Sequence, residues 1–380
     1  MFTKAKVIVA IIVVLIDTTI AQLAMGMNSV LYPVALQGLN LNNTMIGVCL
    51  SMEVFAILTI GQSISAIIAF LGLPRVLVVL PILRALILYF LPTFQTWWAW
   101  SIGIFVFGMA TDMFLISLQI WLNTIQITRF KGLVMGAYAA ALSGGVALGP
   151  IILQYVGTEG RYPFRVNALL CALTALPTLL LYLLIPKLAT TEKPRIAFVI
   201  KNSQAIYASA LVGGITWFGL PAFLTIFGTA NGMSIKDAAF LISFFEFGSV
   251  TVGWAICFFS DFVDRRLFVI VCVFFNLLCA IYLPMAIFNT KLAYLLLFIW
   301  GGLMGGIYSI CLTMIGENFR MEDQVSANVA YVLMDAAGGF IGVNLIGMAM
   351  DTLGNEGLAY VIVAGSVSYF IFALSRYRPI

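Results

Sequence analysis

The chain has 380 residues, of which 63% are hydrophobic and 9% are charged. Water-soluble domains carry about a quarter charged residues, so this composition excludes an ordinary soluble domain and indicates an integral membrane protein. The sequence contains no histidine. This excludes histidine-based metal sites, Ser-His-Asp hydrolysis and histidine-based acyl transfer.

Twelve membrane-spanning helices fit the length of the chain, because each needs about 20 apolar residues and twelve therefore use about 240. Uncharged stretches predict six spans near 5–36, 43–70, 75–91, 97–122, 132–156 and 164–186. They predict six more near 205–228, 237–260, 267–288, 293–316, 324–350 and 357–376. We therefore predict an all-α membrane protein with twelve transmembrane helices.

The longest connection lies between the sixth and seventh predicted spans. Residues 187–204 are polar and basic and contain Pro194. We predict that they link an N-terminal six-helix bundle, residues 1–186, to a C-terminal six-helix bundle, residues 205–380. Transporters built from repeated bundles have this arrangement, with the substrate site near the middle of the membrane between the halves. The alternative is one fused bundle without alternating access.

Lysine and arginine gather on one side of the predicted spans. Of the nineteen, Arg84 lies within a span, and Arg161, Arg165, Lys236 and Lys291 lie on the side opposite the N-terminus. The other fourteen share the side of the N-terminus. The positive-inside rule therefore predicts that both termini and the linker are cytoplasmic.

The sequence gives no sign of a cofactor. The six cysteines lie within apolar runs without paired spacing, as small buried hydrophobic residues do. The chain has no phosphate-binding glycine loop, nucleic-acid-binding surface or large soluble domain, so ATP-driven transport is not predicted. We expect no metal, cofactor, catalytic residue or nucleic-acid partner, and we expect a monomer in the lipid bilayer.

Six ionisable residues lie in the interior of the predicted spans, away from their ends: Asp17, Glu53, Arg84, Asp112, Glu246 and Asp335. An ionised acid near a helix centre costs about 3 kcal/mol on insertion scales, so the five acids must face protein or water, or be protonated. Helical spacing places Asp17 on one face with Asn28, Asp112 with Gln119, and Asp335 with Asn328. These acids and polar residues are our candidates for substrate binding or proton coupling.

Arg84 is the one base that lies away from the ends of the predicted spans. We interpret it as a buried counter-ion of Glu53, Asp17 or Asp112, because an isolated buried charge is costly. One arginine still leaves an excess of acids, and burial without a partner favours the protonated form of a carboxyl. A carboxyl that exchanges a proton is what proton coupling requires. A purely structural role for these groups is the alternative.

The connection after the eighth predicted span reads Gly253-Trp-Ala-Ile-Cys-Phe-Phe-Ser260-Asp261-Phe-Val-Asp264-Arg265-Arg266. It is similar to the serine-aspartate and paired-arginine signature of the major facilitator superfamily, with Asp264 in place of the usual turn glycine. The equivalent loop after the second span keeps only Gly72 and Arg75 of that signature.

The fifth predicted span carries Gly136, Gly145, Gly149 and Pro150, at a spacing that resembles the signature of antiporters of this superfamily. Leu153-Gln154 replace its terminal glycines. We expect a bend at Gly145, Gly149 and Pro150, because the proline frees a backbone carbonyl. Residues 301–308 and 350–354 are similar to small prokaryotic members, which implies a bacterial inner membrane.

The resemblance implies two six-helix bundles, alternating access, and a central cavity lined by the first, fourth, seventh and tenth spans. Asp17 and Asp112 would then lie on the cavity wall. It also implies that the two signature loops meet the opposite bundle on the cytoplasmic side when that side is closed. The residues that form our predicted cytoplasmic gate are Arg75, Arg129, Asp261, Asp264, Arg265, Arg266, Glu322 and Asp323.

Within this gate we predict that Asp261, with Asp264, binds Arg129 or the N-terminus of span 132–156. We predict that Arg75 pairs with Glu322 or Asp323. The alternative is that the loop acids orient Arg265 and Arg266, or are solvated.

These observations together predict a secondary active transporter, not an enzyme. We expect a small polar or cationic organic solute moved by alternating access and coupled to protons, with efflux favoured by the acidic excess and the glycine spacing. A nutrient importer, by symport or facilitated diffusion, is the alternative. A receptor or assembly factor on the same scaffold is an alternative of another class.

Overall fold

A computed structural model describes residues 4–61, 63–124, 131–182 and 196–376. Across these ranges the regular structure is helical, without a strand. The α-helices are α1 (Lys4–Gly38), α2 (Asn43–Ile60), α3 (Ile64–Leu71), α4 (Leu73–Phe90), α5 (Trp97–Thr124), α6 (Lys131–Val156), α7 (Tyr162–Leu173), α8 (Ala175–Tyr182), α9 (Ile196–Asn202), α10 (Gln204–Ala230), α11 (Ile235–Phe259), α12 (Arg265–Ala286), α13 (Thr290–Asn318), α14 (Met321–Leu353) and α15 (Gly357–Arg376). Two short 3₁₀ helices, Leu91–Thr93 and Ser260–Phe262, follow α4 and α11.

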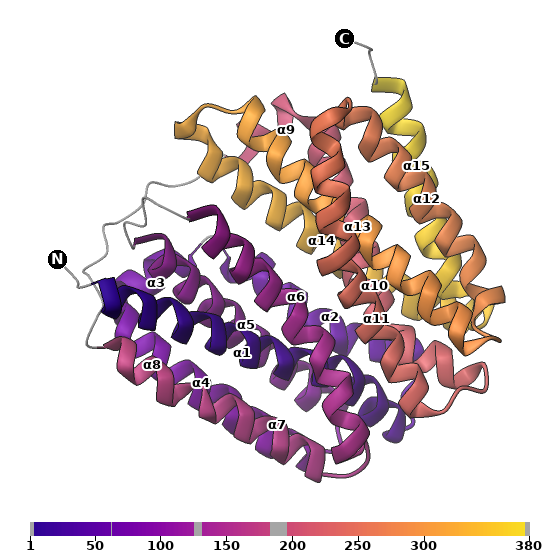
Figure 1. The fold of residues 1–380 in the computed structure, drawn as a ribbon. Coiled ribbons are helices and arrows are strands. Elements are labelled where there is room, and N and C mark those ends of the chain that lie inside the picture. The colour runs from indigo at the N-terminus through magenta and orange to yellow at the C-terminus, as the bar shows by residue number, and fades with distance from the viewer. Residues whose placement is uncertain (1–3, 62, 125–130, 183–195, 377–380) are drawn as a thin grey trace.

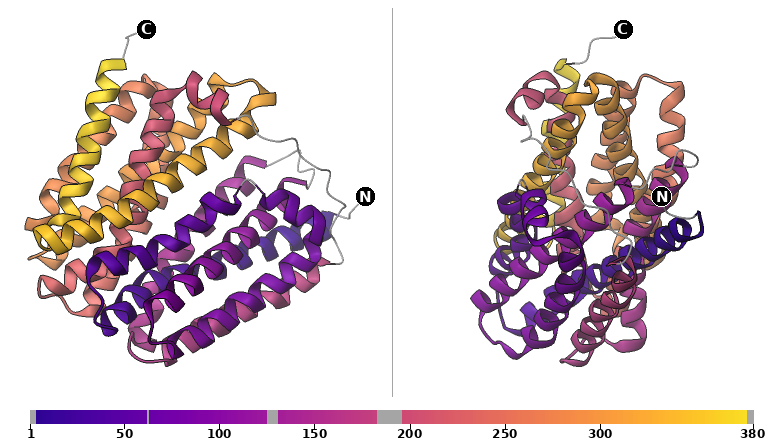
Figure 2. Two further views of the ribbon diagram at one scale, coloured as in Figure 1. Left: turned by 180° about the vertical axis from the view of Figure 1, so that it is seen from behind. Right: turned by 90° about the vertical axis from the view of Figure 1, so that its left-hand side faces the viewer.

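The helices gather in two groups. Helices α1 to α8 form the first group and α9 to α15 the second (Figure 1). We call the end of the molecule where α8 ends and α9 begins the linker face, and the other end the opposite face. The two groups lie close together at the opposite face and diverge toward the linker face, as the view from behind also shows (Figure 2).

Eleven helices of the described residues are long and apolar enough to cross a membrane. The remaining predicted span, 164–186, is described as far as Tyr182 and is divided into α7 and α8. Pro177 has no N–H to donate to the carbonyl of Leu173, and the interruption lies at Thr174 between them. The prediction of an all-α, twelve-helix membrane fold is confirmed.

Two other predicted segments differ from the structure. The predicted span 43–70 is divided into α2 and α3, with the weak helix formers Gly61 and Ser63 at the break. The predicted linker contains a helix, α9, because residues 196–200 are apolar enough to pack: Val199 is fully buried. Residues 187–195 of that linker lie outside the described residues.

Long helices pair closely through glycine in both groups. On α6, a Cβ added at Gly145 would lie 2.6 Å from the carbonyl oxygen of Thr19 on α1, and one at Gly149 would overlap Gly26. In the second group, a Cβ added at Gly301 of α13 would lie closer still to the carbonyl oxygen of Phe245 on α11. Gly145 and Gly149 therefore serve close packing of α1 against α6. The bend expected at Pro150 stays a prediction.

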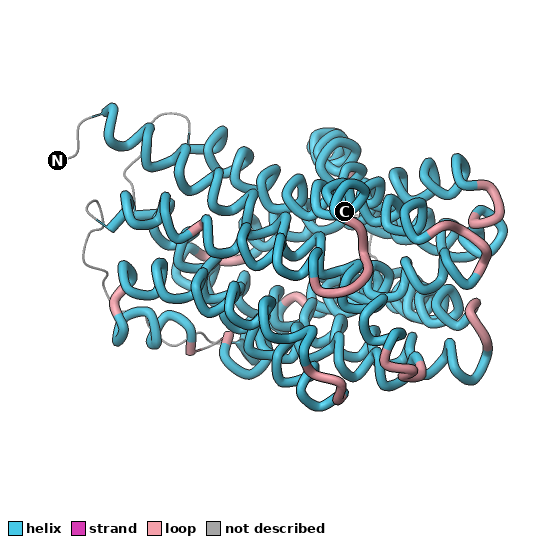
Figure 3. Tube along the Cα trace, turned by 90° about the horizontal axis from the view of Figure 1, so that it is seen from below, coloured by secondary structure: helices cyan, strands magenta, loops and turns pink. Residues whose placement is uncertain are grey.

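Seen from below, the helices run side by side and the connecting turns lie at their ends (Figure 3). An aromatic cluster fills the first group near the opposite face, where Tyr32 packs edge-on against Trp100 at 6.1 Å and Phe107 at 6.3 Å. Phe164 stacks on the same ring at 6.4 Å. Such pairs fix the helices that carry the polar residues described next.

Candidate functional site

Three acids from different helices lie inside the first helix group. Asp17 on α1 is entirely buried, whereas Glu53 on α2 and Asp112 on α5 are half-buried. Neither Asp17 oxygen has a hydrogen-bond partner in the described part of the chain, and Glu53 Oε1 and Asp112 Oδ2 have none either. Glu53 packs on Gly108 of α5, where an added Cβ would lie 3.1 Å from Glu53 Cγ. Because Gly108 has no side chain, Glu53 can pack against α5 at this position, which is one helical turn from Asp112.

Arg84 on α4 is entirely buried beside these acids. Its Nη2 donates to the carbonyl oxygen of Ala21 on α1 at 3.0 Å. Its guanidinium carbon lies 5.2 Å from the ring centre of Phe107 and 5.7 Å from that of Phe114, which are cation–π distances. Arg84 Nε and Nη1 have no partner among the residues described.

The predicted ion pair between Arg84 and Asp17, Glu53 or Asp112 is not formed in this structure. Across the described ranges, the ion pairs within 4.0 Å all involve Arg265. Arg84 lies within electrostatic range of Glu53 and Asp112 without touching them. A backbone carbonyl and two aromatic rings hold the guanidinium instead, so its buried location is as predicted but its partners are not.

Asn28 contacts a residue that the sequence did not single out. Its Oδ1 accepts a hydrogen bond of 2.8 Å from Nδ2 of Asn167 on α7, and the same Nδ2 donates to the carbonyl of Ala24 at 3.1 Å. Both asparagines are fully buried. Asn28 therefore ties α1 to α7 within the first group. Gln119, predicted to share a face with Asp112, is exposed on α5.

Asp335 is the corresponding acid of the second group. It is half-buried on α14 beside Tyr308 and Tyr331, whose rings meet edge-on at 5.5 Å. On the facing helix α10, Gly213 leaves space: an added Cβ would lie 4.0 Å from Asp335 Oδ1. A carboxyl flanked by aromatic rings suits a proton or an organic cation. Asn328, predicted to share this face, is exposed two turns away.

Glu246 lies where the two groups meet. It is 5% exposed on α11 and lies beside the Ser143 hydroxyl of α6. One turn earlier, the hydroxyl of Ser243 donates to the carbonyl of Ala147 on α6 at 2.7 Å. Glu246 thus belongs to the contact between groups, whereas Asp17 and Asp335 lie within their own groups.

The opposite face is closed by hydrogen bonds that the sequence analysis missed. Asp351, at the end of α14, accepts from the backbone N–H groups of Asn43 at 3.0 Å and Thr44 at 2.8 Å, and from the Thr44 hydroxyl at 2.6 Å. It therefore caps the N-terminus of α2 from the other group. Gln154 and Lys236 form a second tie, in which each side chain donates to the other's backbone carbonyl, at 3.0 and 3.2 Å.

The residues that form these bonds could be noticed in the sequence, but their partners could not. Asp351 follows the eleventh predicted span, and Gln154 stands where the family signature has glycine. Neither position indicates a partner by itself, because Asp351 and Thr44 are 307 residues apart in the chain.

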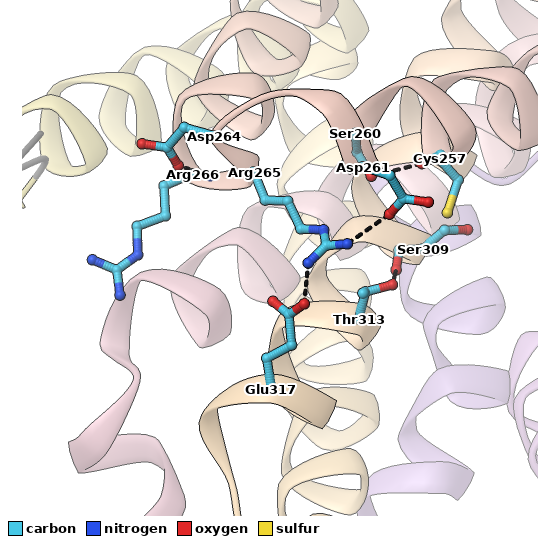
Figure 4. A network of polar contacts seen from close by, with 9 residues as sticks. All are labelled: Cys257, Ser260, Asp261, Asp264, Arg265, Arg266, Ser309, Thr313 and Glu317. Atoms are coloured by element: carbon cyan, nitrogen blue, oxygen red, sulfur yellow. Dashed lines mark hydrogen bonds and ion pairs between the residues drawn. The ribbon is translucent and has the colours of Figure 1, made fainter. Parts of the chain in front are cut away.

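The predicted gate residues of the linker face bind within their own group in this structure. Asp261 accepts from Nη2 of Arg265 at 2.6 Å, and Glu317 of α13 binds Nη1 of the same guanidinium (Figure 4). Asp264 caps α12 by accepting from the Arg266 N–H at 2.8 Å (Figure 4). Asp261 therefore orients Arg265 here, as the alternative interpretation had it, whereas the bond of Asp264 goes to the Arg266 backbone and not to its guanidinium.

The contacts predicted across the linker face stay a prediction for a state closed on that side. Arg129 lies outside the described residues, and so does the side chain of Glu322. Arg75 is exposed and takes part in none of the ion pairs that the described ranges contain, so it is not paired with Asp323.

Comparison with known proteins agrees with this architecture. The family model described as Major Facilitator Superfamily matches residues 14–343. A curated relative from Escherichia fergusonii, described as the uncharacterized MFS-type transporter YcaD, is 24% identical over 285 residues, which are 74% of this chain and 73% of the relative.

Solved transporters share the fold at low sequence identity. A crystal structure of a variant of the nucleoside transporter NupG matches with a TM-score of 0.83 at 14% identity and covers 97% of this chain and 100% of that one. The D-xylose-proton symporter matches with a TM-score of 0.77 at 13% identity and covers 98% and 97%. With the family model matched over most of its length, the chain belongs to the major facilitator superfamily, as its motifs predicted, and is a multi-pass membrane transporter rather than an enzyme.

Proposed function

We propose that this protein is a proton-coupled secondary transporter that moves a small polar or cationic organic solute out of the cell by alternating access. The observation that carries the proposal is the set of interior acids, of which Asp17 is buried without any partner for its carboxyl in the described part of the chain. An ionised carboxyl in such a place costs several kcal/mol. A proton, or the positive charge of a solute, must therefore neutralise it during the cycle.

The positions of the acids support coupling. Asp17, Glu53 and Asp112 lie within one helix group, Asp335 within the other, and Glu246 at their contact. Relative motion of the groups changes the access of Glu246 and Asp335 to water, and therefore the ease with which each holds a proton. Asp335 with its tyrosines offers a matching place for a cationic solute.

The arrangement of the groups supports alternating access. The linker face is the cytoplasmic face according to the distribution of lysine and arginine. The present state, tied at the opposite face by Asp351 and by Gln154 with Lys236, is then open toward the cytoplasm. The other state requires these bonds to break and the predicted gate of Asp261 and Arg129 to form.

Import is the second candidate. The structures with a similar fold include a nucleoside transporter and a D-xylose-proton symporter. Symport would use the same carboxyls, but proton and solute would be bound together and cross in the same direction, whereas in antiport they are bound alternately.

Proteoliposomes test the proposal. The purified protein is reconstituted and assayed with organic cations, nucleosides and sugars, with the pH gradient imposed in either direction or absent. Proton-driven antiport of a cation supports our proposal, and symport supports import. Transport that is indifferent to the pH gradient, or no transport of any solute, contradicts it. In the same assay Asp17→Asn should lose transport driven by the pH gradient. Its matched control is Glu159→Gln, which neutralises an acid in an exposed turn of the opposite face.

A further inference from the structure

A cavity opens at the linker face of the second helix group, away from the interior acids. It has a volume of about 320 Å³ and lies between α9 and the ends of α10, α12, α13 and α15. Its floor is apolar and includes Val269, Ile270 and Met314, all of them buried. Its mouth is polar and is formed largely by the junction of α9 and α10. The cavity thus has a polar mouth and an apolar floor.

The charge of the wall is positive. Lys201 and Arg266 line the cavity, and none of the described residues that line it is acidic. Both bases are exposed, and neither takes part in an ion pair in the part of the chain that the structure describes. Two positive charges on a wall without an acidic side chain attract an anion.

Arg265 shows how a base of this loop is neutralised when acids are present. Its guanidinium is bound by Asp261 and Glu317, whereas the Arg266 side chain runs away from both acids and toward the other side of the loop (Figure 4). Adjacent arginines in one turn therefore have different surroundings. Two carboxylates bind the Arg265 guanidinium, whereas the Arg266 side chain lines the cavity and the bond of Asp264 goes to the backbone N–H of Arg266.

Neutral donors complete the wall. The side-chain amides of Asn202, Gln204 and Asn318 line it. The first residues of α10 also line the cavity. Because the Ser203 side chain makes no cap bond to this helix end, its first backbone N–H groups are not satisfied by a side-chain cap. Bases combined with amide donors are the groups that bind phosphate oxygens in proteins.

We propose that this cavity binds a phosphate-bearing anion, supplied either by the headgroup of an anionic lipid or by a free phosphate compound. The cavity lies at the end of the membrane-spanning helices, where lipid headgroups are found, and its apolar floor suits the glycerol and upper acyl part of a lipid. The site contains none of the interior acids and does not depend on the transported solute.

Binding of lipid and phosphate to the full-length purified protein tests the proposal. The protein in neutral detergent is titrated with phosphatidylglycerol, phosphatidylcholine or inorganic phosphate at constant ionic strength, and bound lipid is counted by native mass spectrometry while Tm is followed. We expect saturable binding of phosphatidylglycerol and not of phosphatidylcholine. Lys201→Gln and Arg266→Gln should each weaken it about tenfold, since a charge-assisted hydrogen bond is lost. Lys291→Gln, at an exposed base of the opposite face, should not.

The inorganic phosphate arm distinguishes the two sources. Competition of phosphate with phosphatidylglycerol, lost in the Arg266→Gln variant, supports a site that a free phosphate compound fills. Binding of the lipid without such competition supports a headgroup site that also needs the acyl part. Equal binding of the two lipids, or unchanged binding in a variant with both Lys201→Gln and Arg266→Gln, would overturn the proposal.

Discussion

The acids in the interior of the helix groups and the acids at the helix ends differ in how their oxygens are satisfied. Asp351 accepts three hydrogen bonds at the opposite face, and Asp261 binds Arg265 at the linker face. Asp17 accepts none from the described residues, although it is entirely buried. Acids at the ends hold helices together, whereas Asp17 in the interior has no partner among the described residues, which is what our proposal of proton coupling requires.

Neutralising an interior acid is expected to have the largest effect on activity. Asp17→Asn and Asp335→Asn preserve size but remove titration, so we predict at least a tenfold loss of transport driven by a pH gradient. Folding should be retained, because a neutral amide is less costly to bury than an unpaired charge. The measurement is driven transport in proteoliposomes with matched protein content. Full driven transport by both variants would show that the interior acids are structural.

The removal of Arg84 should have the largest effect on stability. Arg84→Ala leaves a cavity between Phe107 and Phe114 and removes the hydrogen bond to the Ala21 carbonyl that joins α4 to α1, so we expect a loss of about 3 kcal/mol. Arg84→Met restores most of the volume and should remain within about 1 kcal/mol of the unaltered protein. Unfolding in mixed micelles measures both. If the two variants are equally unstable, the charge of Arg84 matters more than its packing.

Asp351→Asn should loosen the opposite face. It removes charge-assisted bonds to the N-terminus of α2, a loss of about 1 to 2 kcal/mol in the state that contains them. We therefore predict about a tenfold shift toward states open on that face. Distances between spin labels at Glu159 and Asn355 report the shift. Thr352→Ala, whose hydroxyl bonds only within α14, is the control and should leave the distances unchanged.

Asp261→Asn should have the smallest effect on stability. The acid is exposed and pairs with Arg265 four residues away, and exposed pairs are worth about 0.2 to 1 kcal/mol. A double-mutant cycle with Arg265→Gln, read by unfolding, measures the coupling. A coupling energy several times larger than this would mean that the linker face is stabilised as strongly as the opposite face. The contrast between the two ends would then be lost.

The fold could be predicted from the sequence because each membrane span is marked locally by a run of apolar residues. The interruption between α7 and α8 could also have been found, since Pro177 is visible in the sequence. Helix α9 was missed because the basic, proline-containing start of the linker masked the apolar residues around Val199. The interior acids were identified correctly as unusual, because charge within an apolar run is itself the signal.

The partners of these residues could not be predicted in the same way. The bonds of Asp351 to α2 and of Gln154 to Lys236 depend on how two helix groups dock, and no local pattern encodes that docking. Arg84 was expected to pair with an acid because charges attract, yet Phe107, Phe114 and the Ala21 carbonyl hold it. Helix packing decides which groups come within reach of one another.

The movement of protons with the solute tests the central claim most directly. Proteoliposomes that contain the protein and a trapped pH-sensitive dye are given the solute identified in the transport panel, without an imposed pH gradient. Our account predicts a change in internal pH that depends on the protein and is abolished by Asp17→Asn but kept by Glu159→Gln. Solute transport by the unaltered protein without any change in internal pH would contradict it.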